Sequence, residues 1–197
     1  MKILHLSDTH GQHRKLERLP PADIIVHAGD VSMVGESDEI LDFIEWFGRL
    51  DYKYKIFIAG NHDICLDGAE IDGLPENCHY LCNSGVTIEG LKFWGIPFFF
   101  SDDVEGRCPE QMRQIPADTD VLITHRPPLG ILDTASGNTY GCPDMLEAVL
   151  RIYPRYHLLG HIHAAHGIVK AEQTTFVNGA LLDEQYRLTN KPILLDI

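Results

Sequence analysis

Histidine, aspartate and asparagine residues recur in the sequence directly after short apolar runs. The last such stretch, "GHIHAAHG" at residues 160–167, follows "YHLL" and holds His161 and His163 two residues apart, with His166 three residues later. Residues two apart in a strand point to the same face, so the first two imidazoles would project together. Taken alone, the stretch fits either a polar surface turn or two ligands of a metal ion whose other ligands lie elsewhere.

Four other apolar runs end in the same way. The polar residues at the five ends are Asp8, His10, Asp30, Asn61, His62, Asp63, His125, His161 and His163. Each group alone has an ordinary structural explanation, such as a cap or a tight turn. Together they supply nitrogen and oxygen ligands without thiolate, a mixture that suits manganese, iron, zinc or nickel. A carboxylate such as that of Asp30 can bridge two ions about 3.5–4 Å apart.

The elements that must position these residues follow from the hydrophobic pattern. Residues 2–7, 23–28 and 54–59 are short apolar runs that predict buried strands, each ending in a polar loop. Residues 37–50 have apolar side chains at helical spacing, with Ser37 or Asp38 as the expected N-cap. Alternation of strands with loops and helices predicts an α/β layered fold with its site at the carboxyl ends of the strands.

The second half of the chain changes pattern. Residues 86–100 alternate on either side of Glu89-Gly90 and predict a hairpin that turns there. A helix is expected from a proline at residue 143 to another at residue 154. Further strands are expected at residues 120–125, 156–163, 167–172, 174–179 and 192–197. Because no linker, repeat or low-complexity tract interrupts the chain, we expect one domain over residues 1–197, with two sheets.

Composition restricts the class of partner. The chain has 29 acidic and 16 basic residues and a formal net charge of -13, which argues against general nucleic-acid binding. A small phosphoester substrate remains compatible, because bound divalent cations reverse the field inside a cleft. The N-terminus lacks the long apolar core of a signal peptide, and no later run is long enough to span a bilayer. We therefore expect a cytoplasmic protein with no membrane partner, and its oligomeric state stays open.

The cysteines do not form a metal-binding or disulfide pattern. They number five, an odd count, and none are spaced as C-x-x-C. We interpret Cys65, Cys78, Cys82, Cys108 and Cys142 as reduced thiols that mostly serve packing. Redox sensing is the alternative.

The whole set of motifs resembles the calcineurin-like metallophosphoesterase superfamily. Its pattern is D-x-H, G-D, G-N-H-D/E, H and G-H-x-H, and the resemblance runs from Asp8 to His163. Within the superfamily, "SDTHG", "HAGD", "YKIFIAGNHD", "ITHRPPLGILD" and the tail "TTFVNGALL…NKPILLDI" are most similar to the metallophosphoesterase-domain-containing (MPPED) proteins. The resemblance implies a four-layer α/β fold, in which two mixed β-sheets are sandwiched between helices, with a dinuclear metal site at one edge.

The resemblance also implies roles for individual residues. Asp8, His10 and His163 would bind the first divalent cation, Asn61, His125 and His161 the second, and Asp30 would bridge them. His62 would act on the phosphate and the leaving oxygen as a catalytic group, oriented by Asp63 as a charge partner. Arg126, next to His125, could contact the phosphate or a nucleobase or be structural, and His166 is left as a surface or supporting residue.

The implied activity is a phosphodiesterase in which a hydroxide bridging the two metals attacks phosphorus, with a cyclic nucleotide among the candidate substrates. The alternatives are a phosphomonoesterase or protein phosphatase, and a noncatalytic protein-binding scaffold that retains the fold. One departure concerns the frequent G-D-x-x-D pattern, because Met33 occupies the second acidic position. Support from that carboxylate is therefore absent or comes from elsewhere. Some animal MPPED proteins have glycine in place of the first histidine of G-H-x-H, whereas this chain retains His161, so we expect an intact pair.

Overall fold

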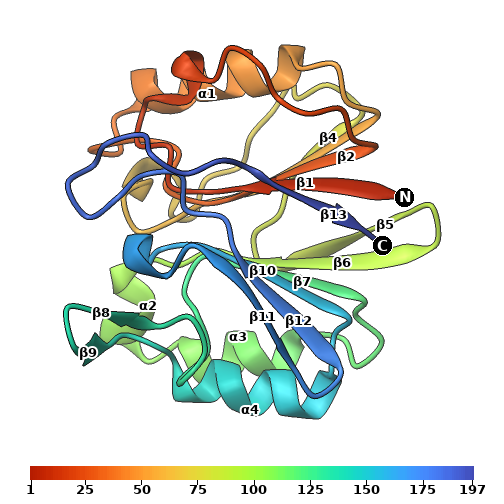
Figure 1. Cartoon of the computed structure of the whole chain (residues 1–197), viewed down its shortest axis with the longest axis vertical. Coiled ribbons are helices and arrows are strands. Elements are labelled where there is room, and N and C mark those ends of the chain that lie inside the picture. Colours follow the sequence, from red (N-terminus) through yellow and green to blue (C-terminus); the bar gives the residue numbers. More distant parts are fainter.

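Two mixed β-sheets form the centre of the computed structural model, which describes residues 1–197 (Figure 1). The first sheet has the order β13 (Ile193–Asp196), β1 (Lys2–Leu6), β2 (Ile24–Ala28), β3 (Tyr54–Ile58) and β4 (Cys78–Tyr80). Strands β1 to β4 are parallel, and β13 pairs antiparallel with β1.

The second sheet has the order β11 (Gly167–Ala171), β12 (Thr174–Asn178), β10 (Tyr156–Leu159), β7 (Val121–Thr124), β6 (Leu91–Ile96) and β5 (Ser84–Ile88). Its four inner strands are parallel, and β11 and β5 pair antiparallel at the two edges. The β5–β6 hairpin turns at Glu89 and Gly90, as the sequence predicted.

Helices cover both outer faces. Helix α1 (Ser37–Arg49) lies over the first sheet, and α3 (Cys108–Gln114) and α4 (Pro143–Ile152) lie over the second (Figure 1). The remaining elements are α2 (Phe100–Glu105), the short hairpin β8 (Thr134–Ala135) and β9 (Asn138–Thr139), and three 3-10 turns, at His13–Lys15, Ile64–Leu66 and His163–Ala165.

Three apolar layers follow from the alternation of side chains along the strands. Ile3 and Val26 face the second sheet and pack against side chains such as Ile123. Their neighbours Leu4 and Ile25 face α1, while on the other side of the molecule Leu122, Leu159 and Phe176 pack against α3 and α4. The predicted four-layer α/β architecture is confirmed.

Three local expectations were wrong. The strand expected at residues 156–163 ends at Leu159 and a 3-10 turn begins at His163, so His161 and His163 do not project together from one strand. The residues after β6 leave the sheet, and Phe100 begins α2 with 60% of its surface exposed instead of extending the strand. Neither Ser37 nor Asp38 caps α1; the N-cap residue is Glu36, and its side chain makes no capping hydrogen bond. Instead the Glu39 carboxylate accepts the Met33 and Val34 N–H groups of the preceding loop.

The two sheets meet at the edge where β1, β2, β3, β7 and β10 end. Beyond β1 and β2, the Asp8 N–H donates to the Gly29 carbonyl at 2.9 Å, and beyond β7 and β10 the Gly160 N–H donates to the His125 carbonyl at 3.1 Å. Ser7 pairs with Ala180 as an isolated bridge between the two halves. The polar groups after all five strands are thereby brought to one place. None of the helices has the length and apolar character required to cross a bilayer.

Candidate metal centre

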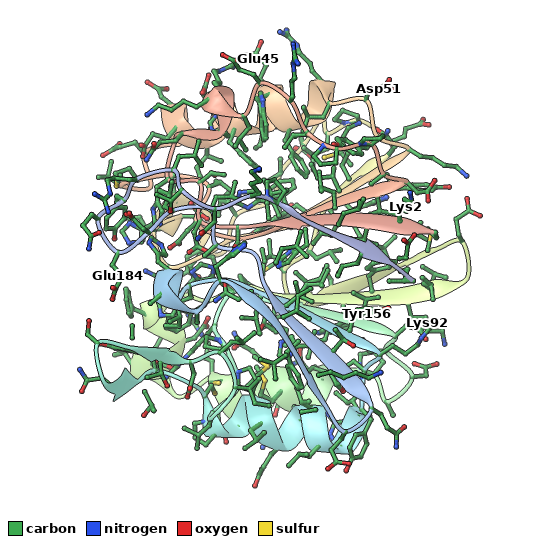
Figure 2. All side chains as sticks on the ribbon, viewed as in Figure 1. Lys2, Glu45, Asp51, Lys92, Tyr156 and Glu184 are labelled. Atoms are coloured by element: carbon green, nitrogen blue, oxygen red, sulfur yellow. The ribbon has the colours of Figure 1, made fainter.

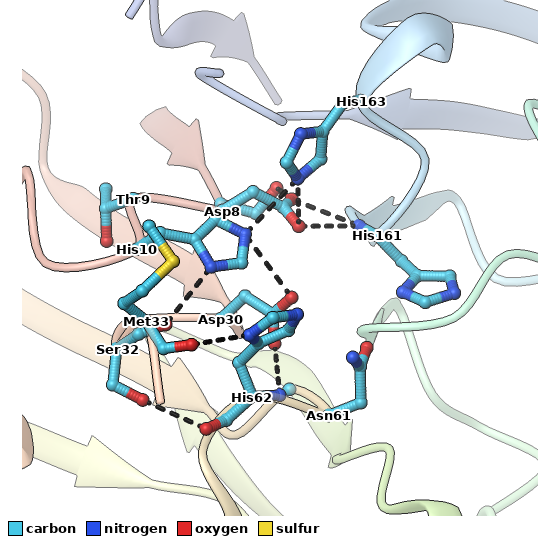
Figure 3. Close-up of polar contacts among 12 residues, drawn as sticks. Asp8, Thr9, His10, Asp30, Ser32, Met33, Asn61, His62, His161 and His163 are labelled. Carbon is cyan, nitrogen blue, oxygen red and sulfur yellow. Dashed lines mark hydrogen bonds and ion pairs between the residues drawn. The ribbon is translucent and has the colours of Figure 1, made fainter. Parts of the chain in front are cut away.

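Asp8, His10 and His163 form one group of candidate metal ligands. Their ligand atoms lie within 4.8 Å of one another. The His163 Nε2 is 3.5 Å from Asp8 Oδ1 and 3.3 Å from His10 Nε2 (Figure 3). Asp8 and His10 follow β1, whereas His163 follows β10, so the group joins the two sheets.

A second group lies beside the first and contains Asp30, His125 and His161, again within 4.8 Å. Asn61 adjoins it, with Oδ1 3.1 Å from His125 Nε2. His161 lies with its ring centroid 5.1 Å from that of His125. The two histidines of the G-H-x-H stretch thus enter different groups, as the resemblance implied.

Asp30 stands between the two groups. Its Oδ2 is 3.5 Å from His10 Nε2 and 3.3 Å from His125 Nε2, while Oδ1 accepts the His62 N–H at 2.9 Å. One carboxylate oxygen therefore faces an imidazole of each group, and the other is held by the backbone. This is the placement that a bridging ligand requires.

Backbone carbonyls fix the orientation of three candidate ligands. The Nδ1 atoms of His10, His125 and His163 hydrogen-bond to the carbonyls of Ser32, Ala28 and Asp183 at 3.1, 2.8 and 3.0 Å. A carbonyl only accepts, so each Nδ1 carries a proton and each Nε2 is the ring nitrogen that faces the centre. Such outer hydrogen bonds commonly orient metal-binding histidines.

The local backbone is strained where the ligands sit. Asp8, His10, Asp30 and His161 have φ values of 54°, 40°, 54° and 70°, in the left-handed region that L-residues rarely adopt. Residues in such conformations cluster at functional sites because the surrounding structure must hold them there.

Two glycines allow the close approach of these loops. A Cβ on Gly60 would overlap Asp30 Oδ1, and a Cβ on Gly160 would lie 2.5 Å from Asp8 Oδ2. Any side chain at either position would displace a candidate ligand. The glycines of G-N-H-D and G-H-x-H are thus required by packing around the carboxylates.

The centre contains buried carboxylates whose negative charge bound cations would neutralise. The carboxylates of Asp8 and Asp30 are buried, and their ion-pair partners are histidines only. Burial lowers the pKa of His125, but Asp30 and Asp8 more than offset this and raise it to about 9. Burial lowers the pKa of His161 to about 4, which keeps that imidazole neutral and able to bind a metal.

His62 lies beside the two groups and is oriented from an unexpected source. Its Nδ1 hydrogen-bonds to the Met33 carbonyl at 2.7 Å, and its ring centroid is 4.6 Å from that of His10 (Figure 3). The support comes from the backbone carbonyl of residue 33, and this contact does not depend on which side chain stands there.

The expected pairing of Asp63 with His62 was wrong. The Asp63 carboxylate is buried and accepts hydrogen bonds from the N–H groups of Val31, Ser32 and Gly60 at 3.1, 2.9 and 2.8 Å, and from the Ser32 hydroxyl at 2.6 Å. All four contacts go to the two loops that carry Asp30 and His62. Asp63 therefore fixes those loops and does not touch the imidazole.

Arg126 lies at the periphery of the centre. Its guanidinium donates to both carboxylate oxygens of Asp103 in α2, at 2.9 and 2.8 Å, and to the Tyr140 carbonyl at 3.2 Å. It also lies over the ring of Phe98, 5.0 Å from its centroid. To contact a phosphate or a nucleobase, as the sequence predicted, Arg126 would have to release Asp103 or bind both groups at once.

Comparison with known proteins places the chain in a family. Residues 1–165 match the model of the calcineurin-like phosphoesterases. This chain belongs to that family. A UPF0046 protein of Caenorhabditis elegans is 35% identical over all of this chain and 75% of its own length, and human metallophosphoesterase domain-containing protein 1 is 34% identical over all of this chain and 71% of its own length.

Solved structures agree on the fold. The crystal structure of TT1561 of Thermus thermophilus superposes with a TM-score of 0.59 at 12% identity, covering 90% of this chain and 88% of that one.

Family membership makes the chain a metal-dependent phosphoric ester hydrolase. The donor set fits divalent cations, because carboxylate, amide and imidazole groups, most of them buried, surround a centre that holds no lysine or arginine, and a bound cation would displace the proton of His125.

One residue at the centre carried no sequence signal. Tyr186, in the loop before β13, has its ring centroid 4.9 Å from that of His10 and 5.2 Å from that of His163. It lines an open groove of about 250 Å³ with Tyr140, Glu184 and the two histidines of G-H-x-H. Tyrosine in a polar tail has no local pattern that marks it, and only the fold brings it here.

Proposed function

We propose that the chain is a phosphodiesterase that works with two divalent cations. Asp8, His10 and His163 would hold one cation, Asn61, His125 and His161 the other, and Asp30 both. The observation that carries the proposal is the position of Asp30 Oδ2, within 3.5 Å of an imidazole nitrogen of each group. When bound, such a pair lowers the pKa of water and withdraws charge from the phosphoryl oxygens.

His62 supplies the proton for the leaving oxygen in this proposal. Its Nδ1 proton is committed to the Met33 carbonyl, so Nε2 is the atom that faces the reaction. An imidazole held in one orientation, next to the site but outside the bridging arrangement, suits general acid catalysis. A competing assignment exists, because His62 also forms a group with His10 and Asp30 within 4.8 Å.

The groove beside the centre supports a diester substrate. Tyr140 and Tyr186 are 44% and 40% exposed and offer aromatic surface next to the phosphate position. Glu184 projects from the same edge of the molecule, where Ser136 of the β8–β9 hairpin donates to it at 3.2 Å (Figure 2). An acidic groove suits an organic group better than a second phosphate charge, and a monoester carries nearly two negative charges at neutral pH.

A cyclic nucleotide fits this description, since its phosphodiester carries one charge and its base can stack on tyrosine. The test is a substrate panel with Mn²⁺, comparing bis-p-nitrophenyl phosphate, p-nitrophenyl phosphate, cyclic nucleotides and a phosphopeptide. We expect the diesters to have the higher kcat/KM. Preference for the monoester or the phosphopeptide would contradict the diester assignment, and hydrolysis of none of them by the metal-loaded protein would indicate a scaffold.

A further inference from the structure

Two cysteines far apart in the sequence lie together outside the metal centre. Cys108 is the first residue of α3 and Cys142 is the N-cap residue of α4, and their Sγ atoms are 3.5 Å apart. The two helices pack side by side over the second sheet (Figure 1). Cys142 is buried at 3% exposure, while Cys108 is half-buried. Neither thiol has a role in the proposed reaction.

The surroundings favour a negative charge on one sulfur. The hydrogen-bond contact with Cys108 lowers the pKa of Cys142 against the effects of burial and of Asp144, helped by the Met145 N–H in the first turn of α4 and by Arg126. The same hydrogen bond and burial raise the pKa of Cys108. The contact therefore favours negative charge on Cys142 and the proton on Cys108.

The pair also borders a small, partly open pocket. Both cysteines line it together with Phe98, Asp103 and Arg126, and the half-buried Cys108 is the more exposed of the two. A thiol of lowered pKa beside such a pocket, with a second thiol in contact, is the arrangement of a reactive dithiol.

We propose that Cys108 and Cys142 form an oxidation site that reacts with hydroperoxides and closes to a disulfide. The Cys142 thiolate attacks the terminal oxygen of ROOH, the O–O bond breaks, and ROH leaves after taking up one proton. The Cys108 sulfur then attacks the sulfur of the resulting sulfenic acid, forming the S–S bond and releasing water. Overall, two thiols and ROOH give one disulfide, ROH and H₂O.

A cation site is the rival use of the same residues. Asp144 lies within 4.8 Å of both sulfurs, so the three could in principle bind a metal. The N-terminus of α4 and the guanidinium of Arg126 oppose a cation at this place, whereas Asp144 favours one. The two uses are separated by adding Cd²⁺, as described below.

The test is peroxide oxidation of the intact, metal-loaded protein, with thiols counted and mass measured. We expect the wild type to lose two thiols and two hydrogens, with recovery on adding dithiothreitol. Cys108→Ser should stop at a sulfenic acid that dimedone traps, and Cys142→Ser should resist. Cys65→Ser is the matched control, because Cys65 is exposed and burial raises its pKa; this variant should oxidise like the wild type.

A second measurement does not depend on the variants folding. In wild-type protein at pH 6, Cys142 should react about tenfold faster than Cys65, because its larger thiolate fraction outweighs its weaker nucleophilicity. Faster reaction at Cys65, or a disulfide at any other pair, would overturn the proposal. So would a thiolate-to-metal charge-transfer band with stoichiometric Cd²⁺ that is lost in Cys142→Ser, since the metal centre itself contains no thiolate.

Discussion

At the residue scale, four imidazoles of the centre are each oriented by a backbone carbonyl that accepts the Nδ1 proton. His10, His125 and His163 each give it to a backbone carbonyl and turn Nε2 to the centre. His62 does the same toward Met33 but lies at the side of the bridging arrangement. The candidate ligands and the candidate catalytic histidine are therefore anchored in the same way. Their roles are distinguished by the metal content and the activity of variants.

His62→Ala should lower kcat for alkyl or cyclic diesters by about 100-fold or more, the scale of general acid catalysis. The loss should be much smaller with p-nitrophenyl esters, because their leaving group is stable as an anion. Steady-state kinetics and elemental analysis are the measurements, and His79→Ala in β4 is the control. Loss of a metal from His62→Ala would instead make His62 a ligand.

Asp63→Asn should weaken metal binding by about 10–100-fold, the usual effect of removing an outer partner of a metal site. The carboxylate accepts four hydrogen bonds. The NH₂ group of an asparagine would point its own donors at some of the groups that now donate to the carboxylate. Metal titration by calorimetry measures this. Unchanged metal affinity would contradict the role of Asp63 in fixing the two loops.

Residue types could be predicted well, but their backbone partners could not. The candidate ligands were identifiable by their type and by their position after apolar runs. The support of His62 by the Met33 carbonyl carries no sequence signal, because every residue has such a carbonyl. The contact of Tyr186 with the centre depends on a loop conformation with φ of 58° at a residue 20 or more positions from any ligand.

At the element scale, the site depends on how closely neighbouring loops pack. Gly60→Ala should destabilise the protein by about 1–3 kcal/mol, the usual cost of overpacking, and lower its metal content, because the new Cβ would overlap Asp30 Oδ1. Gly48→Ala in α1 is the matched control: its Cβ would meet only Pro75, at 3.4 Å, and helix propensity predicts a gain within about 1 kcal/mol. Denaturant unfolding measures both, and equal behaviour of the two variants would contradict the packing argument.

The sequence located most strands and helices α1 and α4, because buried parallel strands are continuous apolar runs and because these two helices have apolar faces. It missed β4, the short β8–β9 hairpin, α2 and α3. Helix α2 was missed because "PFFF" after β6 is typical of a strand that continues. In the structure Phe98 and Phe99 are buried and Phe100 is exposed, so the chain turns away from the sheet within three residues. Tertiary packing, and not the local pattern, decides where β6 ends.

At the scale of the whole molecule, buried histidines make stability depend on pH. His5, His27 and His157 are fully buried, and burial lowers their pKa values to about 4, 3 and 3. The unfolded chain binds protons at these positions below about pH 6.5, whereas the folded chain does not. Their contribution to the free energy of unfolding is therefore constant above pH 6.5 and falls as the pH drops from 6.5 toward 3–4.

His157→Gln isolates one of these groups. It removes the titration but keeps a side-chain nitrogen near Thr124, whose Oγ1 is 2.8 Å from His157 Nε2. Between pH 6.5 and 5 the stability of the variant should fall less steeply than that of the wild type, by up to about 1.4 kcal/mol per pH unit. Urea unfolding of metal-free protein is the measurement, and parallel pH profiles would show that His157 titrates normally in the folded state.

The central claim is a pair of cations that share Asp30, and metal stoichiometry with electron paramagnetic resonance tests it most directly. Protein loaded with Mn²⁺ should contain two ions per chain and give the spectrum of a spin-coupled pair. His161→Ala and His163→Ala should each retain one ion and lose the coupling, because each histidine belongs to a different group. A wild-type content of one ion, or two ions without coupling, would contradict the shared site.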